Sequence, residues 1–166
     1  MDNPFVFFNI KPAVFINVEQ LDQMYYKLQK QIHPDTNTDP FHSNAALALS
    51  SKITKAYNDL KNPIFCIEEI LMLNGTSSLE NLSNMPHFKD LLMTVFELQE
   101  QSLNADRVQF IKELEDRLDQ ISKYIDDSFT LNDTYILERN ALLFSYVYKL
   151  LKRLEDEETD KLIAFN

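Results

Sequence analysis

The sequence predicts an all-α protein made of two helical parts, and two observations carry this prediction. Apolar residues recur at three-and-four spacing through several long runs, which is the period of a helix with one buried face. The 166 residues include one glycine, Gly75, although sharp turns and phosphate-cradling loops need glycine. The same scarcity excludes a P-loop and a dinucleotide-binding loop.

Composition narrows the classes of partner and compartment. The formal net charge is −10, which disfavours nucleic-acid binding because phosphate neutralisation needs a surplus of lysine and arginine. The single cysteine, Cys66, excludes an internal disulfide and a Cys-x-x-Cys motif. No segment has the apolar length of a membrane span, and residues 1–4 resemble neither a signal peptide nor a transit peptide. We therefore expect a soluble bacterial protein of the cytoplasm, with the mitochondrial matrix as the less favoured place.

The first part of the chain predicts an antiparallel pair of helices. Residues 3–9 are aromatic and could form a strand or one helical turn, and the family resemblance described below implies the helix. Asn17 is the expected N-cap of a helix over 18–32. A second helix is expected over 41–60, joined to the first by a loop of roughly eight residues, near the upper end for such connections. Each helix has one apolar stripe, and these stripes should pack together: Val18, Leu21, Tyr25, Leu28 and Ile32 on the first helix, and Ala46, Leu49, Ile53, Ala56 and Leu60 on the second.

The loop between these helices begins with His33-Pro34-Asp35. Pro34 has no backbone N–H and disfavours α geometry in the preceding residue, so the first helix should end near His33. The three residues should then lie exposed between two helices, where binding residues are common. Taken alone, they could equally be a simple helix terminator.

The second part predicts a bundle of three helices after a polar linker. Asn62 and Pro63 should start a strongly apolar helix that ends at Gly75. The segment 76–85 is rich in serine, threonine and asparagine and is the expected linker. Helical runs follow over about 86–103, 105–126 and 132–156, and their short connections predict antiparallel neighbours.

The first helix of this bundle carries two apolar stripes where one is expected. Phe88, Leu91, Val95 and Leu98 form a face that should be core, while Leu92, Met93 and Phe96 lie well round the helix, beside Glu97 and Glu100. The second stripe could be buried inside the chain, if this helix is central. It could also be a partner-binding patch, because exposed apolar side chains bordered by carboxylates are typical of a protein–protein site.

These motifs together resemble a known family. A helix, His33-Pro34-Asp35 and a helix carrying the run from Ile53 to Leu60 resemble the J-domain, which stimulates ATP hydrolysis by DnaK-type chaperones. The rest of the chain resembles HscB, the J-protein cochaperone family of iron–sulfur cluster assembly, through Leu92-Met93 followed by Phe96-Glu97-Leu98. The resemblance implies an L-shaped protein with a J-domain at 1–75, a linker at 76–85 and a scaffold-binding bundle at 86–166.

The resemblance also implies partners and sites. The His33-Pro34-Asp35 loop, with Tyr26, Lys27 and Lys30 on the outer face of the preceding helix, would bind an HscA/DnaK-type ATPase. The scaffold protein IscU would bind Leu92, Met93, Phe96, Glu97 and Glu100, with Tyr146 as the aromatic residue from the last helix. Two lysines make a thin basic face, and Thr36 departs from the lysine that often follows the motif, which together predict weaker electrostatic steering. Asn104 stands where the family pattern has an acidic residue, which predicts a weaker edge of the scaffold site.

No catalytic or metal-binding pattern is present, so we expect no enzyme activity, no metal and no cofactor. The histidines form no zinc motif, and no nucleophile elbow or Cys/His pair occurs. Two alternatives to the HscB role stay open: a J-protein with another client, and a helical enzyme or structural protein in which His-Pro-Asp is coincidental.

Overall fold

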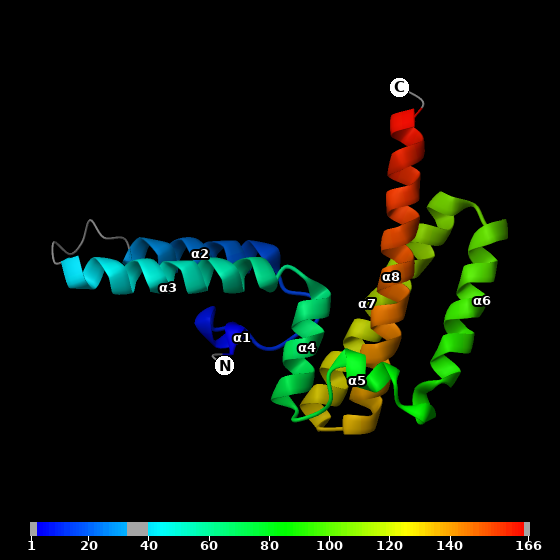
Figure 1. Cartoon of the computed structure of the whole chain (residues 1–166), viewed down its shortest axis with the longest axis horizontal. Coiled ribbons are helices and arrows are strands. Elements are labelled where there is room, and N and C mark those ends of the chain that lie inside the picture. Colours follow the sequence, from blue (N-terminus) through cyan, green and yellow to red (C-terminus); the bar gives the residue numbers. More distant parts are fainter. Residues whose placement is uncertain (1–2, 33–39, 165–166) are drawn as a thin grey trace. The chain divides into compact units, whose positions relative to one another are not determined.

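The computed structural model describes residues 3–32 and 40–164, and every regular element in these ranges is a helix (Figure 1). The prediction of an all-α fold is therefore confirmed. The elements are α1 (Pro4–Phe7), α2 (Val18–Ile32), α3 (Pro40–Asp59), α4 (Pro63–Leu73), α5 (Leu79–Ser83), the 3₁₀ helix η2 (Pro86–Phe88), α6 (Asp90–Asn104), α7 (Arg107–Leu131) and α8 (Thr134–Ala164). They divide into two compact units, Met1–Ile70 and Leu71–Asn166, and the division falls within α4.

In the first unit, α2 and α3 lie side by side and antiparallel. The partners of their polar contacts run in opposite directions along the two helices: Asp22 with Tyr57 (2.7 Å), Tyr25 with Thr54 (3.3 Å), and Gln29 with Ser50 (2.7 Å). The ring of Tyr25 also stacks on that of Tyr57, with 4.2 Å between centroids. The predicted antiparallel pair is thus present, and its register is fixed by side-chain hydrogen bonds as well as by apolar packing.

Burial along this pair is uneven, which corrects part of the predicted core. Leu21, Ile53 and Leu60 are buried, as predicted. Val18 is 50% exposed and Leu49 is 41% exposed, so neither belongs to the core. Val18 is the first residue of α2, and Leu49 adjoins the contact with Gln29, in the half of the pair where apolar side chains are only partly buried. Another helix of this unit, α1, contacts α3, and its Phe5 is buried.

Local capping chemistry sets several helix ends where the sequence predicts them. The Asn17 side chain accepts a hydrogen bond from the Gln20 N–H (2.9 Å), and Asn62 accepts one from the Ile64 N–H (2.9 Å). Gly75 has φ +73°, and Thr76 donates its N–H to the Leu71 carbonyl (3.0 Å), which closes a Schellman motif. Only glycine adopts this φ without a penalty, which accounts for its position after α4.

In the second unit, α8 packs along α7 and also contacts α5 and α6. The helices α7 and α8 are joined by Asn132 and Asp133 alone. Asn132, which the sequence placed at the start of the last helix, instead ends α7 in the left-handed region with φ 57°. Asp133 then caps α8 by accepting the Ile136 N–H (3.2 Å).

The expected linker contains a helix that belongs to the second unit. Ser78 caps α5, and the side chains of Leu79 and Leu82 are buried. Since α5 contacts α8, this polar segment contributes two leucines to the second unit. The domain bounds inferred from the sequence remain a prediction.

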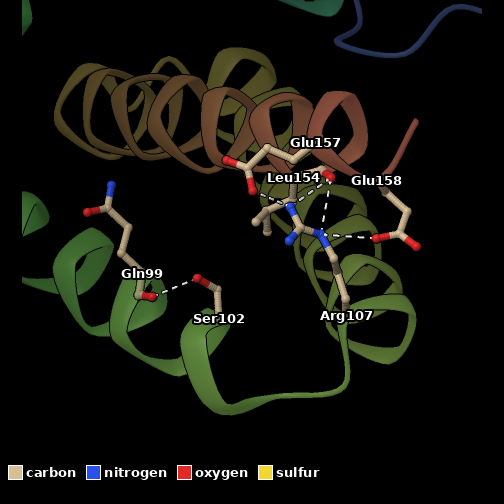
Figure 2. Close-up of polar contacts among 6 residues, drawn as sticks. All are labelled: Gln99, Ser102, Arg107, Leu154, Glu157 and Glu158. Carbon is tan, nitrogen blue, oxygen red and sulfur yellow. Dashed lines mark hydrogen bonds and ion pairs between the residues drawn. The ribbon is translucent and has the colours of Figure 1, made fainter. Parts of the chain in front are cut away.

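The beginning of α7 is fixed to α8 by Arg107 (Figure 2). Its guanidinium donates to the Leu154 carbonyl through Nε (3.4 Å) and Nη2 (3.2 Å), and it also meets the carboxylates of Glu157 and Glu158. In the same view, the Ser102 hydroxyl donates to the Gln99 carbonyl at 2.6 Å within α6. The Arg107 contacts hold the first residue of α7 against α8.

Candidate protein-binding sites

The outer face of α2 is the first predicted site that the structure describes. Tyr26 is 70% exposed, and Lys27 and Lys30 are also exposed. Neither lysine forms an ion pair with a carboxylate of the described residues. The motif His33-Pro34-Asp35 lies outside the described residues, directly after the end of α2 at Ile32.

The two apolar stripes of α6 have different surroundings. On the face predicted as core, Leu91 and Leu98 are buried. On the second face, Leu92 is 41%, Met93 62% and Phe96 58% exposed. The alternative in which this second stripe is buried inside the chain is therefore wrong. A helix that presents three large apolar side chains to water has an apolar surface available to a partner.

A groove of about 380 Å³ runs between this face of α6 and α8. Its lining residues follow the same helical spacing on both sides: Leu92, Val95, Phe96 and Gln99 from α6, and Tyr146, Lys149, Leu150 and Arg153 from α8. A groove lined by aromatic and aliphatic side chains from two helices suits the insertion of apolar side chains from another protein.

Tyr146 takes part in this groove as the aromatic residue expected from the last helix. Its side chain is half-buried, and the burial raises the pKa of its phenol above the ordinary value. Within the described part of the chain, its hydroxyl has no hydrogen-bond partner. The hydroxyl is therefore available to a bound molecule, while the ring contributes apolar surface.

The predicted carboxylates lie on the other side of α6. Glu97 and Glu100 line a second groove, of about 580 Å³, together with Glu113 and Phe110 of α7. Asn104, which departs from the acidic pattern of the family, lines the same groove. Thus Leu92, Phe96 and Tyr146 share one groove, Glu97 and Glu100 share another, and Met93 lines neither.

An ion pair anchors the start of α6 to α8. Arg139 Nη2 lies 2.6 Å from Asp90 Oδ2, and this hydrogen bond lowers the pKa of the Asp90 carboxyl. The same contact raises the pKa of Arg139. With its beginning held by this pair and its end joined to α7 through Ala105 and Asp106, α6 is held at both ends and leaves the groove open between them.

The sequence reasoning missed several groove residues. Val95 was assigned to the core but is half-buried and lines the groove, and Gln99, Lys149, Leu150 and Arg153 were not assigned to a site. A signal for three of them was present, because positions 149, 150 and 153 follow Tyr146 at helical spacing. What the sequence could not supply was which face of α8 meets α6.

In the described ranges, no group of three or more histidine, cysteine, aspartate or glutamate side chains could hold a metal ion. None of the helices described in 3–32 and 40–164 is both long enough and apolar enough to span a bilayer.

Comparison with known proteins gave consistent results in sequence and in structure. A co-chaperone protein HscB homolog of Neisseria gonorrhoeae is 35% identical over 109 residues, which are 63% of this chain and 64% of that protein. The homolog of Haemophilus ducreyi is 37% identical over 103 residues, 60% of this chain and 59% of its own length. The matches thus span somewhat less than two thirds of these relatives. No family model matches the chain.

Solved structures extend the likeness of fold to nearly the whole chain. Chaperone HscB from Vibrio cholerae superposes with a TM-score of 0.70 at 22% identity, covering 95% of this chain and 98% of that one. Human co-chaperone protein HscB superposes with a TM-score of 0.72 at 15% identity, covering 95% and 83%. At such identities the likeness concerns the fold.

By fold, the described chain is of the helical class of the solved HscB chaperones. Within this class, the curated homologues and the solved structures support an HscB-type cochaperone.

Proposed function

We propose that this chain is a cochaperone that binds the iron–sulfur scaffold IscU through its second unit and delivers it to an HscA/DnaK-type chaperone. The His33-Pro34-Asp35 loop then stimulates the ATPase of that chaperone, and the maturation of iron–sulfur proteins is assisted. Support comes from the HscB names of the relatives. Their bacterial sources favour the cytoplasm as the place of this work, and the chain itself performs no catalysis.

The observation that carries this proposal is the exposed stripe Leu92, Met93 and Phe96 beside the groove with Tyr146. Interface hot spots are large apolar or aromatic side chains near the centre of a patch, surrounded by polar residues that exclude water. Leu92 and Phe96 fit that description at the groove, and Met93 extends the apolar surface beyond it. Glu97 and Glu100 then belong to the polar rim.

For the chaperone, the proposed contact combines the loop with the outer face of α2. Tyr26, Lys27 and Lys30 are exposed there, and the two lysines would attract an acidic surface. The resemblance to J-domains implies that the loop engages the chaperone between its ATPase domain and linker, where Asp35 pairs with an arginine.

The test is the triple variant Leu92→Ala, Met93→Ala, Phe96→Ala. We expect scaffold binding to weaken at least ~100-fold, because each hot-spot side chain contributes about 2 kcal/mol and 1.4 kcal/mol corresponds to tenfold. Basal stimulation of the chaperone should persist. Affinity is measured by calorimetry with purified scaffold, and the melting temperature is measured on the same samples.

A matched control removes a similar amount of exposed apolar surface elsewhere in the second unit. Leu103, Val108 and Leu131 are 82%, 70% and 77% exposed, and none lines the groove. Their replacement by alanine should leave scaffold affinity unchanged. Equal loss in both triple variants would argue against the groove, and a wild-type chain that does not bind the scaffold would point to a J-protein with another client.

A further inference from the structure

The α8 side of the groove carries two cations without a partner. Lys149 and Arg153 are both exposed lining residues, and no ion pair joins either one to a carboxylate in the part of the chain that the structure describes. Three neighbouring cations, by contrast, are paired: Arg107 with Glu157 and Glu158, Arg139 with Asp90, and Lys152 with Glu155. The groove wall is therefore positive, although the whole chain has a formal net charge of −10.

The carboxylates of α6 are placed so that they do not neutralise this wall. Glu97 and Glu100 line the second groove, on the other side of the Leu92–Phe96 stripe. The stripe thus has cations on one flank and carboxylates on the other. Opposite charges on opposite flanks favour a partner in one orientation and disfavour the reverse one.

An apolar partner that filled the groove would remove water from Lys149 and Arg153. Desolvating a cation without giving it a counter-charge costs free energy, whereas a carboxylate placed beside it offsets that cost. The apolar surroundings formed by Leu92, Phe96 and Leu150 also lower the local dielectric constant, which strengthens such a pair. A purely apolar or a basic segment would bind less well for the same reason.

We infer that Lys149 and Arg153 select a segment of the scaffold that carries a carboxylate next to its apolar anchor residues. This inference rests on the proposed function, because it takes the scaffold as the occupant of the groove. Lys149 and Arg153 act as specificity-determining residues, while Leu92 and Phe96 supply most of the affinity.

The test is the charge reversal Lys149→Glu with Arg153→Glu, compared with Lys112→Glu and Arg117→Glu. Lys112 and Arg117 are exposed on α7, line neither groove and have no ion pair in the described chain, so both double variants change the net charge equally. Calorimetry with purified scaffold should show a loss of at least about tenfold for the groove variant. The α7 variant should change affinity by less than about threefold, because distant exposed charges are screened at 0.15 M salt.

Two further measurements separate the possible outcomes. The neutral variant Lys149→Gln with Arg153→Gln should bind the scaffold less tightly than wild type. Its affinity should also fall less steeply as the salt concentration is raised. If the charge reversal impairs folding, this neutral variant serves as the test. Equal affinities of the groove and α7 variants, with the alanine triple still defective, would overturn this inference and leave the proposed function intact. A wild-type chain that does not bind the scaffold would overturn both.

Discussion

Single side chains carry the proposed contact with the chaperone, and His33 is the one whose replacement should matter most. His33→Gln is expected to abolish stimulation of the chaperone ATPase while folding and scaffold binding persist, and Asp35→Asn should act similarly. Surface substitutions usually change stability by about ±0.5 kcal/mol or less, and we expect the same at these two positions. Single-turnover ATP hydrolysis measures the effect, and circular dichroism checks the fold.

The control is the exposed histidine His87. His87 lies in η2 of the second unit, so His87→Gln should leave stimulation at the wild-type level. Wild-type stimulation by the His33 variant would reject the assignment of the loop.

For single residues, the roles that depend on residues nearby in the sequence were predictable. Asn17, Asn62 and Gly75 cap helices through contacts only a few residues away, so their chemistry is visible in the sequence. Leu49 and Val95 were assigned to the core because helical spacing gives a face but not what covers it. Their exposure depends on whether another element covers that face, and the sequence does not contain this information locally.

Among the elements, the contact between the first residue of α7 and α8 gives a definite prediction about Arg107. Arg107→Ala removes hydrogen bonds to the Leu154 carbonyl and two carboxylate partners, so the free energy of unfolding should fall by about 1–2 kcal/mol. Hydrogen exchange should quicken in α8 around Leu154 and not in α2. Arg107→Lys should restore little, because an ammonium lacks the planar fork.

The control variant is Arg117→Ala on the same helix. Arg117 is exposed and has no ion pair in the ranges that the structure describes, so its removal should leave the melting temperature nearly unchanged. If both alanine variants melted at the wild-type temperature, the Arg107 contact would not contribute to stability.

Helix boundaries show where element prediction works and where it fails. The range 18–32 was predicted for α2 and is observed, because a cap residue precedes it and Pro34 follows it. For α7, an end near residue 126 was predicted, yet the helix continues to Leu131. Ser128 is buried there and donates its hydroxyl to the Tyr124 carbonyl, which satisfies its polar group without leaving the helix. The leucines of α5 were too few to reveal a helix in a polar segment.

For the whole molecule, the division into two units places each proposed contact in a different unit of one chain. The α2 face belongs to Met1–Ile70, and the groove belongs to Leu71–Asn166. We expect the two contacts to be separable by mutation but to be needed together. An equimolar mixture of the His33→Gln chain and the alanine triple should therefore fail to give scaffold-dependent stimulation.

A single chain with two binding units can link two partners, and the amount of the joint complex is largest at an intermediate concentration of that chain. Once both partners meet on one chain, each is held near the other at a high effective concentration. When the chain is in large excess over both, separate copies occupy the chaperone and the scaffold, and fewer joint complexes form. A titration of ATP hydrolysis should thus show scaffold-dependent stimulation that rises, passes a maximum and declines, whereas a plateau would mean that the chain does not act as a bridge.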